Sequence, residues 1–143
     1  MAGVAGGHLL DTSFVIDCWH NRAEALARLE RLFADGGPLY ITEVVVGELF
    51  TGLREADRAT ARGLLEPIEF IQPGPETAVN AGIWRAEARE RGSTLHLADA
   101  LIAAAAHAVG ATVVTRNLRD FALTPVMVED YWREASPASP SGR

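Results

Sequence analysis

The sequence predicts an α/β fold in which a mainly parallel central sheet is flanked by helices. Short, largely apolar segments typical of buried strands alternate with longer segments whose apolar residues recur at helical spacing. Parallel strands need helical connections of this kind, which cross the sheet in a right-handed sense. The chain has 143 residues, 48% of them apolar, which suits one domain with a single core.

The first half of the chain opens with a short strand that is expected to end at an acidic residue. Leu9 and Leu10 are followed by Asp11, which places this carboxylate where open α/β sheets bind ligands. Ser13 can cap a short helix that runs through Trp19. The next segments are predicted as helices over 22–35, 43–54 and 57–65 and as strands over 39–41 and 69–71. The valines of the 43–54 segment also permit a strand.

The second half continues this alternation. Helices are predicted over 76–91 and 97–109, and strands over 111–115 and 125–128, with a polar turn over 116–121. Gly92 and Gly110 follow the two helices, as is typical of helix ends. The first of these helices has an expected core side made of Ala78, Val79, Gly82, Ile83 and Ala86. The alanines of the second allow a close approach to the sheet.

The domain organisation is expected to be simple. We predict a flexible N-terminal lead over residues 1–8, one domain over 9–135 and a flexible, low-complexity tail over 136–143. The first residues lack the pattern of a signal peptide, and no apolar run reaches the roughly 18–20 residues of a membrane span. The single cysteine, Cys18, cannot form an internal disulfide. These features predict a cytoplasmic protein that does not associate with membranes.

Charge and composition exclude several function classes. The formal net charge of −6 argues against a protein that coats nucleic acid, although an enzyme can still hold a few phosphates locally. The chain has no lysine, which excludes P-loop and Schiff-base chemistry and a receiver domain. It also lacks the Asp-x-Asp motif of haloacid-dehalogenase phosphatases, the Gly-x-Gly-x-x-Gly of dinucleotide-binding modules and the ligand spacing of structural zinc sites.

Four carboxylates stand where burial is costly unless it serves a purpose. They follow strands or lie in apolar helices: Asp11, Glu48, Asp99 and Asp120. If they gather at one edge of the sheet, they repel one another unless a cation lies between them. A ligand set made only of oxygen atoms suits Mg²⁺ or Mn²⁺. The sequence therefore predicts a magnesium site in which Mn²⁺ can substitute.

Each of these residues also has a purely structural interpretation. Asp11 or Ser13 can cap the following helix, and Asp99 can complement the dipole at a helix N-terminus. Glu48 can point to solvent from an amphipathic helix, and Asp120 can form an Asx-turn. The joint pattern, more than any single residue, favours a site. The four histidines have no recognisable setting, so solvated or core positions are expected for them.

Four stretches, taken in order, resemble the PIN-domain family and, within it, the VapC-type toxins of bacterial toxin–antitoxin pairs. They are residues 9–13 (LLDTS), 48–53 (ELFTGL), 97–103 (LADALIA) and 114–121 (VTRNLRDF). The resemblance implies a PIN-like three-layer α/β/α fold and a magnesium-dependent ribonuclease that hydrolyses phosphodiesters with a metal-activated water. It also implies a homodimer and a cognate VapB-like antitoxin.

The resemblance further assigns roles to residues. It implies that Asp11, Glu48, Asp99 and a carboxylate of the last stretch hold the magnesium. Many relatives have an acidic residue where Asn117 stands, so either Asp120 or this neutral amide completes the site. The supporting residues are predicted to be Thr12, Ser13, Thr115, Arg116, Asn117 and Arg119. The first two can hydrogen-bond a phosphate or a metal-bound water, and the two arginines can hold the RNA backbone.

Two alternatives stay open. The chain can be a catalytically weak PIN-fold module that binds RNA or protein, or a nuclease directed at DNA. Apolar residues can form a groove for a partner helix or simply fill the core: Trp19, Leu26, Phe33, Phe50 and Leu53.

Overall fold

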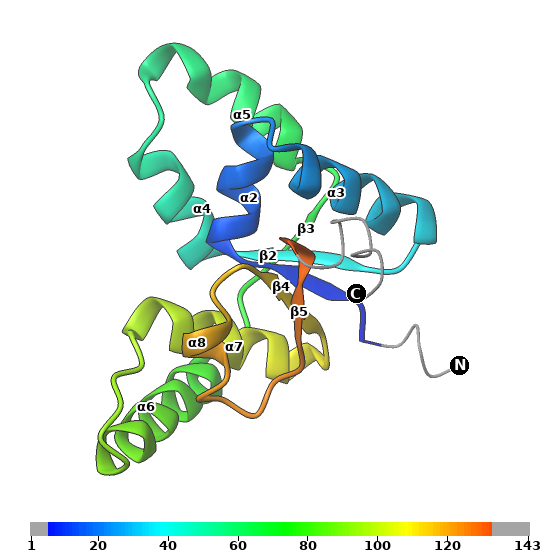
Figure 1. Ribbon diagram of the computed structural model, residues 1–143. Helices are drawn as coiled ribbons and strands as arrows, with labels where there is room; N and C mark the ends of the chain where they lie inside the picture. The colour runs from blue at the N-terminus through cyan, green and yellow to red at the C-terminus, as the bar shows by residue number, and fades with distance from the viewer. Residues whose placement is uncertain (1–5, 133–143) are drawn as a thin grey trace, which may run out of the picture.

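A computed structural model describes residues 6–132 as three layers, with a central sheet covered by helices on both faces (Figure 1). The sheet has five strands in the order β3-β2-β1-β4-β5, and every neighbouring pair is parallel. The strands are β1 (His8–Leu10), β2 (Leu39–Thr42), β3 (Glu69–Ile71), β4 (Thr112–Thr115) and β5 (Val128–Asp130). The predicted fold class is therefore confirmed.

The helices divide between the two faces of the sheet. One face carries α2 (Thr12–Trp19), α3 (Ala23–Asp35), α4 (Glu43–Thr51) and α5 (Arg58–Leu65) (Figure 1). The other carries α6 (Pro75–Glu90), α7 (Leu97–Val109) and the short α8 (Leu118–Phe121). A 3-10 turn, Glu55–Asp57, precedes α5. The segment whose valines also permit a strand is the helix α4, and Thr42 caps it by accepting a hydrogen bond from the backbone N–H of Val45 at 3.4 Å.

The sheet is buried on both sides, which explains the unbroken apolar runs of its strands. Five apolar strand residues are each at most 1% exposed: Leu9, Leu10, Ile41, Val113 and Val114. Residues 103–106 of α7, all alanines, are also buried, and they pack in the clusters that join this helix to the sheet and to α6. This packing confirms the close approach that the alanines predict.

Two glycines let the chain reach β1 between two loops. Gly7 has φ +64°, and a Cβ on it would lie 2.4 Å from the carbonyl oxygen of Pro38. A Cβ on Gly6 would lie 1.7 Å from the carbonyl oxygen of Gly110. The backbone N–H of His8 then donates to Pro38 at 2.9 Å, and β1 begins there. Of the segments expected to be flexible, residues 1–5 and 136–143 lie outside the described part of the chain.

The helix α6 differs from the prediction in the face that it buries. The stripe expected in the core is exposed: Ala78, Val79, Gly82, Ile83 and Ala86. The helix instead buries other small residues, and Ala81 and Ala88 pack in one cluster with alanines of α7. Because small residues on both helices let the backbones approach closely, the larger side chains of the stripe stay outside.

Two boundaries near the C-terminal end also differ from the prediction. The turn expected over 116–121 contains the helix α8. The last strand starts at Val128, where the sequence placed its end, and its Asp130 is in register with Thr115 of β4. As a consequence, Asp120 lies on a helix and not in a turn.

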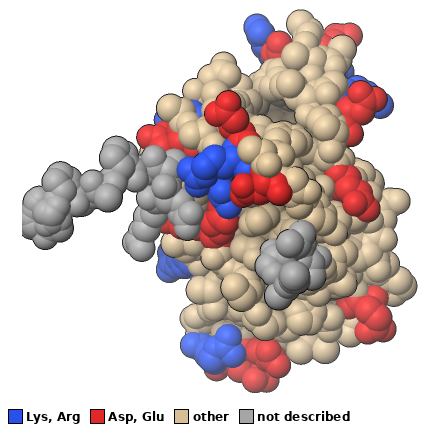
Figure 2. All heavy atoms as spheres, turned by 90° about the vertical axis from the view of Figure 1, so that its right-hand side faces the viewer, with Lys and Arg blue, Asp and Glu red and all other residues tan. Residues whose placement is uncertain are grey.

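The net charge and the face seen in Figure 2 indicate little bulk attraction for a polyanion. The side from which β1 and β2 start faces the viewer in Figure 2, where basic side chains lie beside acidic ones and no broad basic surface is visible. The formal net charge of −6 agrees with this view. Within residues 6–132, no helix combines the length and the apolar character that crossing a membrane requires.

Candidate active site

The predicted site residues converge on one edge of the sheet, where its parallel strands end. Asp11 directly follows β1 and Thr115 ends β4, and these two strands are neighbours. Asp99 lies in the first turn of α7, and Asp120 lies in α8. Segments that are far apart in the sequence therefore deliver their side chains to the edge where open α/β sheets bind ligands.

Asp11 is the most deeply buried of the predicted carboxylates. It is 2% exposed, and its Oδ2 accepts hydrogen bonds from Ser13 Oγ at 2.9 Å and Thr115 Oγ1 at 2.7 Å. Its other oxygen, Oδ1, is buried without a hydrogen-bond partner in the described part of the chain. Asp11 stands at the N-cap position of α2, but its side chain makes no capping hydrogen bond. The hydrogen bonds of this carboxylate therefore come from the hydroxyl groups of Ser13 and Thr115.

The unpartnered oxygen of Asp11 is the clearest chemical signal of the site. Leaving a buried polar atom unsatisfied costs about 1–3 kcal/mol, and in native proteins a bound ion often satisfies such an atom. Burial raises the pKa of Asp11, and the hydroxyl groups of Thr115 and Ser13 oppose this rise. A cation beside Oδ1 would satisfy the oxygen and favour the charged form of the carboxyl.

Asp99 and Asp120 form a group with a histidine, His96. One possible ligand atom from each of the three residues lies within 4.8 Å of the others. His96 is the N-cap residue of α7, so the start of this helix supplies two members of the group and α8 supplies the third. No motif in the sequence singled out His96. The available signal was its spacing, because residues three apart at the start of a helix share one face.

The charged groups of this cluster perturb one another. Burial, followed by the hydrogen bond with Asp120, raises the pKa of Asp99 from 3.8 to about 7, and the charges of Asp11 and Glu48 add to the rise. Burial also raises the pKa of Asp120, but its hydrogen bonds with Asp99 and His96 outweigh burial and hold it below 3.8. The hydrogen bond to Asp120 raises the pKa of His96. A divalent cation would relieve the repulsion between the carboxylates.

Thr115 and Asn117 connect the carboxylates. Asn117 Nδ2 donates to Asp99 Oδ2 at 3.0 Å, and the backbone N–H of Asn117 donates to Thr115 Oγ1 at 2.8 Å. Thr115 in turn donates to Asp11, so hydrogen bonds link Asp99 to Asp11. The sequence leaves open whether Asn117 or Asp120 completes the site. In the structure Asp120 lies in the carboxylate group, and Asn117 supports Asp99 as a hydrogen-bond donor.

Glu48 borders the cluster at an exposed position, which agrees with the interpretation that it points to solvent from an amphipathic helix. Leu49 and Val45 take the buried side of α4, which turns Glu48 outward. Its carboxylate accepts a hydrogen bond from the hydroxyl of Thr12 at the start of α2. Its charge is close enough to contribute to the raised pKa of Asp99.

The two arginines of the last stretch have different surroundings. Arg116 binds the buried Asp17 through Nε at 3.0 Å and Nη2 at 3.2 Å, and the hydroxyl of Tyr131 also donates to Asp17. The backbone N–H of Arg116 donates to Ser13 Oγ at 3.1 Å. Arg116 therefore belongs to a scaffold beside Asp11 although its side chain is half exposed, and Arg119 is also exposed to solvent.

Comparison with known proteins identifies the family. A family model for the PIN domain matches residues 8–126 of the chain. The chain belongs to the PIN domain family. This PIN domain is 29% identical over 129 residues to the tRNA(fMet)-specific endonuclease VapC of Salmonella typhimurium, covering 86% of this chain and 96% of that protein. It is 27% identical over 123 residues to the ribonuclease VapC19 of Mycobacterium tuberculosis, covering 86% and 98% of the two chains.

Solved structures of other PIN domain proteins resemble this one. A chain of VapBC2 from Rickettsia felis, crystallised with a DNA fragment from its promoter, has a TM-score of 0.75 and 26% identity. The match covers 85% of this chain and 96% of that chain. A chain of a toxin–antitoxin complex from Klebsiella pneumoniae has a TM-score of 0.73 and 28% identity, with coverage of 87% and 98%.

The acidic site of this PIN domain suits a divalent metal ion. The carboxylates of Asp11, Asp99 and Asp120 supply the hard oxygen donors that such ions prefer. Asp11 Oδ1 is a buried donor that no described residue satisfies. These residues are therefore chemically suitable ligands for a divalent metal ion.

Proposed function

We propose that this protein is a metal-dependent endoribonuclease that acts in the cytoplasm as the toxin of a VapC-like toxin–antitoxin pair. The observation that carries the proposal is the buried, unpartnered Oδ1 of Asp11 in a PIN domain, close enough to Asp99 for its charge to raise the pKa of that carboxyl. Relatives named as ribonuclease, endonuclease and toxin–antitoxin complex support the same activity here. We expect Mg²⁺ from the carboxylate ligands, with Mn²⁺ as a substitute.

The residues that would hold the cation are Asp11, Asp99 and Asp120. A bound divalent cation supplies a water of lowered pKa for attack on the phosphodiester and neutralises charge on the phosphate oxygens. Ser13 and Thr115 both bind Oδ2 of Asp11 and thereby fix the direction in which Oδ1 is presented. Asn117 fixes the carboxylate of Asp99 in the same way.

Glu48 and Arg119 are placed to act on the substrate. Glu48 is exposed and held by Thr12, so it can orient the attacking water and accept its proton. Arg119 is exposed and adjacent to Asp120 in the sequence, so it can bind a phosphate of the RNA backbone. Arg116 acts through the scaffold that holds Ser13, and we expect it to support the site.

Mapped cleavage of total cellular RNA tests this function. The purified protein should cut RNA when Mg²⁺ is present and stop in excess chelator. Asp11→Asn should abolish cleavage, because the variant keeps the size of the side chain but loses the charge that binds the cation. Undiminished cleavage in chelator, with the variant used to exclude contaminating nucleases, would refute metal dependence. Binding of RNA without cleavage would indicate a binding module, and cleavage of DNA alone a DNA-directed nuclease.

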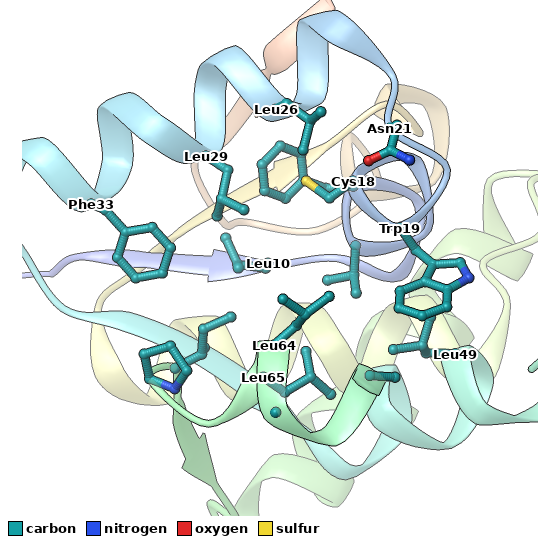
Figure 3. A pocket seen from close by; sticks show the side chains of 16 residues that line it. Leu10, Cys18, Trp19, Asn21, Leu26, Leu29, Phe33, Leu49, Leu64 and Leu65 are labelled. Carbon is teal, nitrogen blue, oxygen red and sulfur yellow. The ribbon is translucent and has the colours of Figure 1, made fainter. Parts of the chain in front are cut away.

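An apolar cavity between α3 and α5 is the site that we propose for the antitoxin (Figure 3). It has a volume of about 400 Å³, and leucines from both helices point into it. Leu26, Phe33 and Leu64 line it and are 39%, 44% and 59% exposed. A group of exposed apolar side chains of this kind suits an amphipathic helix that inserts residues at i, i+3 or i+4, and i+7.

This cavity only partly matches the groove that the sequence suggests. Trp19, Leu26 and Phe33 line it as predicted, but Phe50 and Leu53 do not. Leu53 is buried in the core, and Phe50 packs against that core from a half-buried position. The two residues therefore follow the alternative interpretation, in which they fill the core.

A charge placed in the cavity tests the antitoxin site. Leu64→Glu should abolish pull-down of the cognate VapB-like antitoxin while RNA cleavage is retained, because a carboxylate in an apolar groove is costly to bury. Met127→Glu is the matched control, since Met127 is 72% exposed and lies outside the cavity. Equal antitoxin binding by both variants would rule out this cavity as the site.

The outward stripe of α6 is the surface that we propose for a homodimer. Val79 and Ile83 are 50% and 48% exposed, and the small residues beside them leave room for a second helix. Ile83→Glu should convert the dimer into a monomer in size-exclusion chromatography with light scattering. A dimer that persists in this variant would place the interface elsewhere.

A further inference from the structure

We propose that His96 is a nitrogen ligand of the bound cation, so that this site prefers a first-row transition ion such as Mn²⁺ over Mg²⁺. The inference rests on the metal-dependent function proposed above and concerns which ion the site selects. It starts from His96 Nδ1, which lies 2.8 Å from Oδ2 of Asp120. A ligand set made only of carboxylates would give no reason to prefer Mn²⁺ over Mg²⁺.

The spacing of the three side chains admits one cation. The ligand atoms of His96, Asp99 and Asp120 lie within 4.8 Å of one another. Donor atoms at about 2.1 Å from an octahedral ion are about 3 Å apart as neighbours and about 4.2 Å apart as opposites. The three atoms are therefore nearly as close as a shared ion requires, and small side-chain rotations suffice to complete the approach.

The His96 side chain does not support its own helix, and its polar contact in the described residues is with Asp120. Its ring is 72% exposed, and it makes no capping hydrogen bond although it occupies the N-cap position of α7. Only the backbone of His96 contributes to the helix, because its carbonyl accepts a hydrogen bond from the N–H of Ala100 at 2.9 Å. An exposed ring that contacts a carboxylate of the site is therefore available to a ligand.

A second observation points independently to a cation beside Asp99, next to this group. Asp11 Oδ1 is buried and unpartnered, and the charge of Asp11 reaches Asp99 strongly enough to perturb it. Glu48 adds a further negative charge from α4. Negative charges on several elements, and not on one residue pair alone, therefore attract a positive ion toward His96.

The nitrogen donor decides which ion is preferred. Mg²⁺ selects oxygen ligands and keeps much of its water, whereas imidazole is a good ligand for first-row transition ions. Replacing one oxygen of the set by His96 nitrogen therefore favours Mn²⁺, and Co²⁺ more strongly, over Mg²⁺. If His96 only forms an exposed ion pair with Asp120, the ion preference does not depend on it.

Calorimetric titration of metal-free protein with Mn²⁺ and Mg²⁺ tests the proposal. His96→Asn is the informative variant, because Asn is a favourable N-cap residue and its amide nitrogen cannot bind a metal. It should lose about tenfold or more in Mn²⁺ affinity, as ligand-sphere changes commonly do, while Mg²⁺ affinity changes little. His20→Asn is the control, since His20 is exposed at the end of α2 and should behave as the wild type.

Pulsed EPR of the Mn²⁺-loaded proteins gives a readout that does not depend on activity. Coupling of Mn²⁺ to a nitrogen nucleus should appear in the wild type and in His20→Asn and be absent in His96→Asn. If the wild type binds Mn²⁺ without nitrogen coupling, or if His96→Asn binds Mn²⁺ as tightly as the wild type, His96 is not a ligand. Either result would leave the proposed metal-dependent nuclease intact. If neither ion binds to any of the proteins, both this proposal and the metal-dependent function fail.

Discussion

The raised pKa of Asp99 should make the stability of the metal-free protein depend on pH. Burial, the hydrogen bond with Asp120 and nearby negative charges raise this pKa from 3.8 to about 7. Between these two values the folded protein keeps a proton that the unfolded chain has released. The stabilisation from this proton is therefore fully present below 3.8 and is lost as the pH rises through about 7.

The size of this effect follows from the two pKa values. Each tenfold change in an ionisation equilibrium is worth about 1.36 kcal/mol, so a fully shielded carboxyl would contribute about 4 kcal/mol. Asp99 is partly exposed, and screening by solvent reduces the contribution to about 1–2 kcal/mol. Asp99→Asn mimics the protonated side chain, because its amide can still donate to Asp120 but cannot ionise. The variant should therefore keep the stability that the wild type loses.

Urea unfolding in excess chelator at two pH values measures the difference. From pH 5 to pH 8, the free energy of unfolding of the wild type should fall by about 1 kcal/mol relative to Asp99→Asn, because about two thirds of the interval between the two pKa values lies above pH 5. At the higher pH, added Mg²⁺ or Mn²⁺ should raise the melting temperature of the wild type and not that of the variant. If the two proteins show the same pH dependence and the same metal-induced rise, Asp99 does not belong to the site.

Three other predictions concern residues outside the metal cluster. Burial raises the pKa of Glu129, but hydrogen bonds from His8 and Arg28 outweigh it and lower the value from 4.5 to about 2. Glu129→Gln should therefore cost about 2–3 kcal/mol of unfolding free energy at pH 7. Because a lowered pKa stabilises the fold only above its ordinary value, urea titrations should show this cost shrinking as the pH falls toward 2, and a constant cost would contradict the ion pair as its source. Arg119→Ala should weaken RNA binding and reduce its salt dependence by about one phosphate contact, whereas Arg116→Ala should lower the melting temperature because it leaves the buried Asp17 without its arginine partner. RNA filter binding at several salt concentrations and thermal melts measure these effects. Weaker RNA binding in Arg116→Ala and a lower melting temperature in Arg119→Ala would show that the two roles are reversed.

The layers of the fold could be predicted because their signals are local. Strands buried on both faces have unbroken apolar runs, and Leu9 and Leu10 show where the first one ends. Topology alone places the carboxylate after such a strand at the binding edge of the sheet, so Asp11 could be predicted from the sequence. The motif around Asp99 could also be predicted, because the sequence clearly indicates the helix at whose start it lies.

The features that the sequence missed depend on contacts between distant segments. The buried face of α6 is decided by the alanines of α7, and no periodicity within α6 reports its partner. Glu48 is turned outward because its neighbours Val45 and Leu49 take the core side. The link from Arg116 to Asp17 joins two segments that no short motif connects. His96 stands at the N-cap of α7, and no motif in the sequence marks a histidine there as a ligand.

The contact between Tyr131 and α2 limits how the chain can be shortened or fused. Tyr131 is 0% exposed, its ring meets that of Phe14 edge-on at 4.7 Å between centroids, and its hydroxyl donates to Asp17. A version that stops at Asp130 would leave a void beside Phe14 and deprive the buried Asp17 of its hydroxyl partner. An affinity tag or fusion partner should therefore be joined after Trp132, where all described contacts of the helix α2 are kept.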